Sequence, residues 1–468
     1  DDTFTVSLGN VDPHTGAFVS LSGGGPHTPD PDALRVDATR RFGRFFSPGE
    51  SSVSASAVGT LSGEGGFALG SFVARLNSDE SAILNPLFSG LLGSSLNLTL
   101  VGYQGMASGQ VTLGELLATG TFSAGTVSEL LDADITLAHL FQAGVLALTN
   151  RGGAASLAAA TPLGTLAAHV NSSLHLRLGD LIKVAQGSNG AAADAELNVL
   201  DLASMATQVA DGDHFVDLTL PVIVPGVATA RLRLMLIEPP QIAIGPARLG
   251  TDGEWVTRAK TAQVRARLDL RLASLLLGLA TVNLPIYLEG GGAEAALVDT
   301  DCSEPFPHQE ATIEVTTRAV SSYIGSVGET DLKDTTTPVS VGPAALVNLD
   351  LLLTDITVSG SADAVSAATT QDVAFTKPWD WDNTETVGAS SLGLGNLLRS
   401  DLSLSVSVAG LGLTVNSVRT ALLGLLNPLL TSLDTELLAP LGAALGLRLG
   451  GADVTAFSLD CEARRLVG

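Results

Sequence analysis

Alternation of apolar and polar residues characterises the first part of the chain. In FTVSLGNVDP (4–13) and VSASAVGTLS (53–62), apolar side chains recur at every second position, which is the period of a β-strand with two different faces. ALRVDATRRFGRFF (33–46) is a further strand candidate that carries several arginines. Glycine- and proline-rich segments such as SGGGPHTPDPD (22–32) separate the runs and are typical of turns. The pattern predicts an N-terminal β module over residues 1–65.

The apolar period changes towards that of a helix in the next part of the chain. FALGSFVARLNSDESAILNPLFSGLLG (67–93), TLGELLATG (112–120) and VSELLDADITLAHLFQAGVLAL (127–148) place apolar residues at i, i+3 and i+4. Between the first two of these segments, SLNLTLVGYQGMASGQVTL (95–113) alternates and predicts a strand hairpin. Residues 66–190 are therefore expected to form a helix-rich region that contains one hairpin.

Strand patterns return after this region and continue towards the end of the chain. HFVDLTLPVIVPGV (214–227) and the segments that follow predict a β module over 191–302. Residues 303–345 are polar and are expected to form a linker or loop. A last β module over 346–468 contains apolar helices near 418–445. The patterns together predict an α+β fold, with mostly antiparallel β modules and an inserted Leu/Ala/Gly-rich helical region.

The last two β modules are expected to end in stretches of the same form. GGAEAALVDTDC (291–302) and GGADVTAFSLDC (450–461) each begin with Gly-Gly-Ala and an acidic residue and end with Asp-Cys. Their cysteines, Cys302 and Cys461, are the only two in the sequence. Such a pair can be two separate buried thiols, a redox pair, half of a metal site or a disulfide. No CxxC motif and no histidine close in sequence supports the metal site.

We favour a disulfide between Cys302 and Cys461. Pairing of two related modules would bring the equivalent ends of two strands side by side, as the short Cα–Cα separation of a disulfide requires. A stable disulfide indicates an oxidising compartment, such as a periplasm or the cell exterior.

The charge of the chain is strongly one-sided. There are 48 acidic residues against 24 lysines and arginines, which gives a formal net charge of −24. Such a chain repels phosphate backbones and anionic membrane surfaces, so nucleic acid is not expected as a partner. The apolar run LASLLLGLATVNLPIYL (272–288) contains Asn283 and Pro285 and is shorter than the roughly 20 residues of a spanning helix, so no membrane span is expected. The chain begins at Asp1 without a methionine, which agrees with removal of an N-terminal signal or anchor.

The sequence lacks the short motifs of common active sites. Its seven histidines are scattered, and neither HExxH, a GxSxG elbow nor a P-loop occurs. Paired carboxylates such as Asp132 and Asp134 do occur, but a chain with 48 acidic residues produces such pairs by chance. We therefore expect no catalysis and no catalytic cofactor.

One stretch, KPWDWDNTETVG (377–388), has the composition of a cation-binding loop. Its candidate ligands are Asp380, Asp382, Asn383 and Glu385. Calcium prefers oxygen ligands of this kind, although the spacing is not that of an EF-hand. The two tryptophans of the stretch support two alternatives, namely binding of a sugar or a protein partner, and a loop whose tryptophans pack against the module.

Several segments that occur in a fixed order carry a family resemblance. They are FTVSLGNVDPHTGAF, ALRVDATRRFGRFF, AILNPLFSGLLGSSLNLTLVGYQGMASGQVTLGELL, TVSELLDADITLAHLF, VNLPIYLEGGGAEAALVDTDC, NTETVG and the terminal GADVTAFSLDC. Over essentially its whole length the chain resembles the TadG-like proteins associated with bacterial Flp/Tad pilus loci. Members of that family usually begin with a membrane-anchoring helix and a small helical collar, whereas this chain begins at its strand region. The resemblance implies a location at the cell envelope or surface and a role in pilus assembly, anchoring or adhesion, and it transfers no catalytic residue.

The expected function is that of an extracellular or cell-envelope structural or interaction protein. It would be pilus-associated or filament-forming, with protein partners or self-association. An alternative is a carrier of an apolar ligand such as a lipid, in which VRTALLGLLNPLLTSLDTELLAPLGAALGL (418–447) forms one wall of a Leu/Ala-lined groove. The same segment could instead cover a sheet. A third hypothesis is an enzyme whose site the fold assembles from distant residues.

Overall fold

The structure of the chain is a computed structural model. It describes residues 2–11, 18–20, 33–44, 48–61, 63–70, 78–185, 188–210, 215–220, 227–238, 241–249, 253–261, 263–272, 280–290, 292–302, 309–318, 320–334, 339–351, 354–365, 368–377, 383–388, 403–407, 420, 424, 431–432, 451–461 and 464–467.

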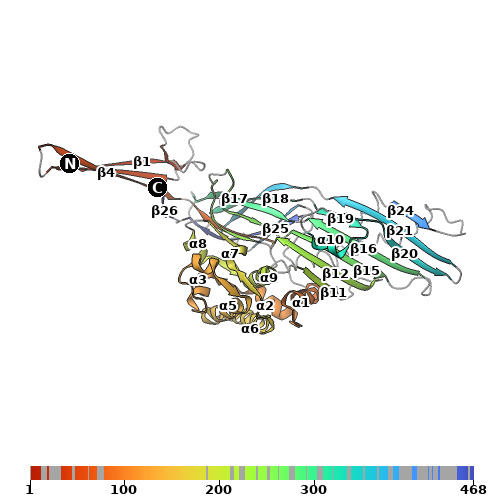
Figure 1. Ribbon diagram of the computed structural model, residues 1–468. Coiled ribbons are helices and arrows are strands. Elements are labelled where there is room, and N and C mark those ends of the chain that lie inside the picture. The colour runs from red at the N-terminus through yellow and green to blue at the C-terminus, as the bar shows by residue number, and fades with distance from the viewer. Residues whose placement is uncertain are drawn as a thin grey trace.

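A narrow sheet projects from one end of the molecule, and we call it the arm (Figure 1). In spatial order its strands are β2 (Phe18–Ser20), β1 (Asp2–Val11), β3 (Ala33–Gly43), β4 (Glu50–Leu61) and β26 (Arg464–Val467). β1, β3 and β4 lie where the alternating sequence predicts strands, whereas β2 was not predicted. The fifth comes from the other end of the chain and pairs antiparallel with β4. The arm is therefore attached to the rest of the molecule through both β4 and β26.

Two sheets packed face to face follow the arm, and we call them the sandwich. One sheet consists of β23 (Thr384–Gly388), β25 (Gly451–Asp460), β5 (Glu64–Leu69), β13 (Ile242–Pro246) and β9 (Ile182–Val184). The other consists of β14 (Arg258–Lys260), β17 (Ala293–Asp301), β18 (Glu310–Thr317) and β22 (Thr370–Thr376). Alanine, valine and phenylalanine side chains from both sheets fill the space between them and form a separate core.

A large sheet forms the end of the molecule opposite the arm (Figure 1). Its order is β11 (Phe215–Leu220), β12 (Val227–Glu238), β15 (Gln263–Leu272), β16 (Ala280–Gly290), β19 (Val320–Ile324), β21 (Thr354–Val365) and β20 (Ala344–Leu351), and β24 (Ser403–Ser407) also pairs with β21. The short helix α10 (Glu329–Lys333) lies between β19 and β20 in sequence. Strict alternation in β11, β12 and β15 gives this sheet one apolar face and one charged face.

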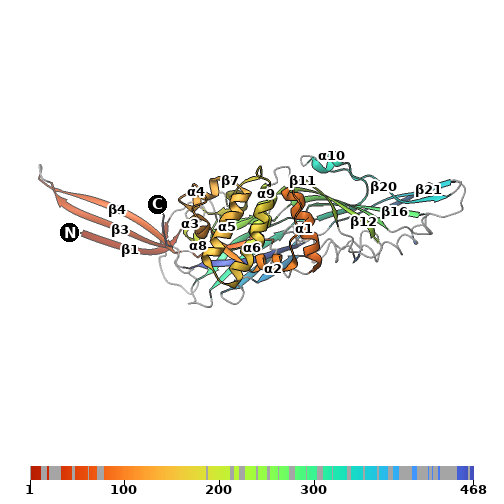
Figure 2. The ribbon, with the colours of Figure 1, turned by 90° about the horizontal axis from the view of Figure 1, so that it is seen from below.

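Helices lie along one side of the body (Figures 1 and 2). They are α1 (Ser78–Leu92), α2 (Leu100–Ser108), α3 (Leu113–Ala118), α4 (Val127–Asp132), α5 (Leu137–Arg151), α6 (Ala154–His169), α7 (Leu178–Leu181), α8 (Asn189–Asp194) and α9 (Val199–Ala210). Between them run the short strand pairs β6 (Gln110–Thr112) with β10 (Glu196–Asn198), and β7 (Asp134–Thr136) with β8 (His175–Arg177).

Threonine side chains begin several of these helices. The hydroxyls of Thr112, Thr126 and Thr136 each accept a hydrogen bond from the backbone amide three residues later, at the start of α3, α4 and α5. The leucines of the helices and the apolar face of the large sheet belong to one continuous core. This core joins the helices to the sheet, so the two pack as one body.

The protein is thus of the α+β class, with much β-structure that is mostly antiparallel. Apart from the parallel pair β9 and β13, every strand pairing in the described residues is antiparallel. In the part of the chain that the structure describes, no helix is long and apolar enough to cross a membrane.

The predicted hairpin at 95–113 is wrong, because the middle of this segment, Leu100–Ser108, is the helix α2. The hydroxyl of Thr99 accepts a hydrogen bond from the amide of Gly102 at 3.2 Å and so caps the helix. Tyr103 and Met106 lie one turn apart on its buried face. The alternation of LNLTLV ends at Thr99, and the sequence beyond it has small residues that suit close helix packing.

The prediction of a polar linker over 303–345 is also wrong, since β18 and β19 lie inside it. In β18, EATIEVTT, alternate residues are buried, and Ala311, Ile313 and Val315 enter the core of the sandwich. The intervening glutamates and threonines make the segment look polar as a whole. Its period of two is the feature that indicates a strand.

The strands before and after Cys302 do not form two separate paired modules. β16 pairs with β20 and β19 pairs with β21, so one sheet takes strands from 191–302, 303–345 and 346–468. The two strands of the twinned endings, β17 and β25, lie in opposite sheets of the sandwich instead of pairing edge to edge. Sequence order therefore does not divide this β-structure into consecutive modules.

Candidate functional site

Arginines at alternate positions form the charged face of the large sheet. β12 carries Arg231 and Arg233, and β15 carries Arg267 and Arg271, all on the face opposite the leucines of the core. The register places Arg231 opposite Asp269 of β15. Because residues directly opposite in a sheet share a face, these side chains gather in one place.

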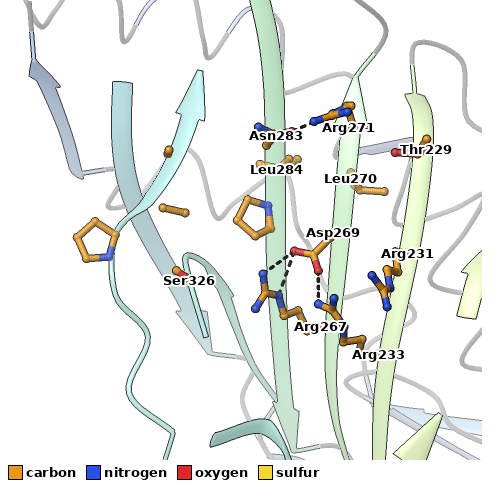
Figure 3. Close-up of a pocket in the computed structure, with 14 residues that line it drawn as sticks. Thr229, Arg231, Arg233, Arg267, Asp269, Leu270, Arg271, Asn283, Leu284 and Ser326 are labelled. Carbon is orange, nitrogen blue, oxygen red and sulfur yellow. Dashed lines mark hydrogen bonds and ion pairs between the residues drawn. The ribbon is translucent and has the colours of Figure 1, made fainter. Parts of the chain in front are cut away.

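A groove of about 480 Å³ lies on this face, between β12, β15, β16 and the segment that leads into β20. Its floor holds four arginines and Asp269, with Asn283 and Ser326 at its sides. Figure 3 shows Arg233 and Arg267 both directed at the carboxylate of Asp269. We call it the arginine groove.

Short hydrogen bonds to carboxylates fix three of the four guanidinium groups of the groove. Arg267 donates from Nε and Nη2 to Oδ1 of Asp269, at 3.0 and 2.9 Å, and Arg233 donates from Nη1 to its Oδ2 at 2.8 Å. Arg231 makes two bonds, of 2.7 and 2.5 Å, with Asp217 of the neighbouring strand β11. These bonds hold the pKa of Asp217 below its ordinary value and raise that of Arg231. The carboxylate of Asp217 thus remains ionised and keeps Arg231 in place.

The segment with α10 covers the neighbouring part of the charged face. Arg265 donates to the backbone oxygen of Asp334 and pairs with Glu289 at 2.7 Å, and Arg267 donates to the backbone oxygen of Val327. Beneath the segment, burial raises the pKa of the Tyr287 hydroxyl well above its usual range. The arginine groove lies next to this covered part, because Ser326 lines the groove and the adjacent Val327 accepts from Arg267. Figure 2 shows the position of α10.

The chemistry of the groove is that of anion binding. Four arginines and one aspartate line it, so its local charge is positive in a chain of net charge −24. Guanidinium groups held by carboxylates present their remaining donors in a fixed plane that suits a carboxylate or phosphate. Among the described residues that line the groove there is no histidine, cysteine or tyrosine.

Cys302 and Cys461 form the predicted disulfide, which lies at the junction of the arm and the sandwich. Cys302 follows β17 and Cys461 follows β25, and their Cα atoms are 5.6 Å apart. Gly63, between β4 and β5, lies against it: a Cβ added there would stand 2.9 Å from Sγ of Cys302. The bridge thus joins the two sheets of the sandwich at the place where β4 and β26 leave the body.

The calcium candidate lies partly outside the described residues. Asp380 and Asp382 are not among them. Asn383 precedes β23 and Glu385 lies on that strand, both with exposed side chains. Within the described ranges, no group of three histidine, cysteine or acidic side chains is placed to hold a metal ion.

The arm carries a second candidate surface, formed by exposed large apolar side chains. Of the eleven large apolar side chains that are exposed among the described residues, seven belong to the arm. They are Phe4, Val6, Leu8, Val19, Leu34, Phe42 and Val53, with exposed fractions between 40% and 71%. Contiguous apolar surface of this kind marks a site of interaction with another molecule.

The comparisons with known proteins concern another part of the chain. Residues 80–208 match a domain of unknown function, DUF8293. This match extends from within α1 to within α9 and includes neither the arm nor the arginine groove. No curated protein and no solved structure matches the chain.

The sequence contains a pattern that indicates the arginine groove, although it was used only to predict strands. In TARLRLMLIE and QVRARLDLRL, arginine and leucine alternate, so one face of each strand is cationic. In a strongly acidic chain, two such segments indicate a charged face with a role of its own. Their common location depends on the pairing of β12 with β15, which the sequence does not show.

Proposed function

We propose that the protein is an extracellular or cell-envelope structural and interaction protein that does not act as a catalyst. The observation that carries the proposal is the arm, a single sheet that projects from the body and exposes most of the chain's described apolar surface residues. A projecting apolar surface suits attachment to another molecule. The disulfide supports a location in an oxidising compartment.

The resemblance to TadG-like proteins supports the more specific form of the proposal. In that form the protein is pilus-associated or filament-forming, and its partners are proteins of a surface assembly or further copies of itself. The arginine groove offers a second, polar contact for the carboxylates of such partners.

We further propose that the helices are an insertion in the β framework. β5 and β13 pair directly although residues 78–210, which contain the helices α1 to α9, lie between them in sequence. A framework that closes across a long segment tolerates that segment as an added unit, because the entropy of loop closure rises slowly with length. The matched domain, 80–208, has nearly the same limits.

Two other functions have no comparable support. The expected wall of an apolar-ligand carrier, 418–447, lies almost entirely outside the described residues. For an enzyme, the candidate general base among the described residues that line the arginine groove is Asp269, and its carboxylate already accepts hydrogen bonds from Arg233 and Arg267.

The proposal is tested by locating the protein and the oxidation state of its cysteines in the cells that make it. Intact cells are treated with a membrane-impermeant biotin reagent, and fresh extracts are treated with a maleimide before and after reduction. We expect surface labelling, and cysteines that react only after reduction. A protein confined to the cytoplasm with free thiols at Cys302 and Cys461 would contradict the proposal.

A further inference from the structure

We propose that the apolar face of the arm is a docking surface for the same face of a second copy of the chain. This inference rests on the proposed function and names the partner that the arm accepts. It follows from the distribution of side chains over the two faces of one sheet.

The register of the arm places all of its exposed large apolar residues on one face. Phe4, Val6 and Leu8 lie opposite Ala38, Val36 and Leu34 of β3, and those residues lie opposite Ala55, Ala57 and Gly59 of β4. Phe42, Val53 and Val19 have the same parity on their strands. We call this surface the apolar face.

The opposite face of the same strands is polar. On β1 it carries Thr3, Thr5 and Ser7, and β4 adds Ser52, Ser54 and Ser56. Polar groups of this face bond to each other. The hydroxyl oxygens of Thr39 and Ser54 lie 2.9 Å apart, and Nη2 of Arg35 lies 3.0 Å from Oδ1 of Asp37. An amphipathic sheet of this kind normally covers its apolar face. In the arm, Val6 keeps 60% and Val53 keeps 60% of their surface exposed, so this face is uncovered.

The charge of the apolar face permits a second copy to approach despite the acidic chain. The described side chains of this face carry one charge, that of Arg40 near the tip. The register also places Asp2 of β1, opposite Arg40, and Arg464 of β26, opposite Leu61, on this face. Its charged positions are thus few and of both signs, so the repulsion between two chains of net charge −24 acts mainly between their bodies. The arm's length keeps those bodies apart from the contact (Figure 1).

The area of the apolar face is close to the smallest that a specific dimer requires. Three strands of about ten residues, at roughly 3.3 Å per residue and 4.8 Å between strands, present about 500 Å². Two copies then bury about 1,000 Å², which is near the smallest area of a specific interface. The sheets would lie about 10 Å apart, as two packed sheets do. The contact is isologous, and we expect a dimer that dissociates on dilution.

The chemistry of the face favours a protein sheet over a lipid surface. Valine, leucine, alanine and phenylalanine also fill the space between the two sheets of the sandwich in this protein. Surfaces that enter the membrane interface are enriched in tryptophan and tyrosine. All three tryptophans and all three tyrosines of the chain lie beyond residue 100, outside β1 to β4.

Two matched pairs of variants test the inference. Val6→Glu puts a charge on the apolar face, and Thr5→Glu puts the same charge on the polar face of the same strand. Val53→Glu and Ser54→Glu repeat the comparison on β4. Since all four side chains are exposed, each variant should fold, which far-ultraviolet circular dichroism checks.

Sedimentation equilibrium of the purified chain over a wide range of concentration is the readout. We expect a reversible dimer for the wild type, a dissociation constant raised about tenfold or more by Val6→Glu and Val53→Glu, and little change with Thr5→Glu and Ser54→Glu. A wild type that stays monomeric throughout, or variants on the two faces that behave alike, would overturn the inference.

Binding to lipid vesicles tests the alternative that the apolar face docks onto a lipid surface and not onto a second copy of the chain. The wild type and Val6→Glu are floated with neutral phosphatidylcholine vesicles and with vesicles that contain phosphatidylglycerol. Binding that Val6→Glu abolishes, in a chain that does not dimerise, would assign the face to lipid and overturn the inference. A monomeric chain at the cell surface contradicts this inference alone. A dimerising chain with free thiols in the cytoplasm contradicts the proposed function alone.

Discussion

At the scale of single residues, Arg151 joins three elements of the helical part. From the end of α5 it donates to Glu115 at the start of α3, at 2.7 and 2.9 Å, and to Glu196 of β10 at 2.9 Å. Glu115 also accepts from the amide of Thr112, at 2.9 Å, in a capping box. One carboxylate thus serves both the local helix start and a tertiary contact.

We predict that Glu115→Gln lowers the free energy of unfolding by about 1–2 kcal/mol, because a neutral amide bonds Arg151 less strongly. The matched control is Glu129→Gln. Glu129 holds the same position in α4, and its carboxylate accepts from the amide of Gly125 on an exposed surface. Chemical denaturation followed by circular dichroism should show a clearly smaller loss for the control, and equal losses would contradict the role of Arg151.

The same pair predicts a dependence on pH. Burial opposes ionisation of Glu115, but the hydrogen bonds from Arg151 and Thr112 outweigh it and hold the pKa below the ordinary value of 4.5. A carboxyl whose folded pKa is lowered contributes stability above its unfolded pKa, and this is lost as the pH falls through the folded pKa. The stability difference between wild type and Glu115→Gln should therefore be constant above about pH 5 and shrink below pH 4.5. A difference that does not change in this range would exclude the contribution.

At the scale of elements, α2 and α6 approach closely at a glycine. A Cβ added to Gly105 would stand 2.5 Å from the backbone oxygen of Ala158, which cannot move aside without shifting α6. A Cβ added to Gly102, one turn earlier, would meet Pro162 at 3.5 Å, an ordinary contact. The distance between α2 and α6 therefore depends on Gly105 and not on Gly102.

This difference predicts opposite effects of the same substitution on one helix. Gly105→Ala should destabilise the protein by about 1–3 kcal/mol, as overpacking does. Gly102→Ala should be neutral or stabilise it by up to about 1 kcal/mol, because alanine favours the helix. Thermal unfolding of the two variants checks both signs. A stabilising Gly105→Ala would mean that the helices are farther apart than the structure shows.

At the scale of the whole molecule, the disulfide connects the arm to the sandwich. Cys461 lies three residues before β26, so the bridge fixes the start of this arm strand, which comes from the C-terminal part of the chain. It closes a sequence separation of 159 residues, which is worth about 5 kcal/mol in the loop-entropy estimate, less any strain.

We predict that the double variant Cys302→Ser/Cys461→Ser unfolds at a lower temperature and loses amide-exchange protection first in β26 and β4. Reductant should lower the midpoint of the wild type in the same way. The double variant is its own control, because reductant should leave it unchanged. A wild type indifferent to reductant, with both thiols shown to be free, would contradict the stabilising role of the bridge.

Local features of the chain could be predicted from the sequence because each depends on the residue pattern within a single helix, strand or short segment. Alternation indicated β1, β3 and β4, and the twinned endings indicated the bridge between Cys302 and Cys461. The prediction was wrong where a segment combined two different residue patterns. The segment 95–113 alternates at its start yet becomes helical after its Thr99 cap, and β18 alternates within a stretch that is polar on average.

The sequence by itself determined which strands have two different faces and that the chain is acidic, and it favoured a disulfide between its two cysteines. Only the tertiary structure decided which strands share a sheet, because pairing between distant segments depends on register and on the whole set of competing partners. It also decided what each apolar face meets. The apolar faces of β12 and β15 are buried in the core, whereas the equally apolar face of β1 is open. Periodicity shows that a face is apolar, and only the packed fold shows whether anything covers it.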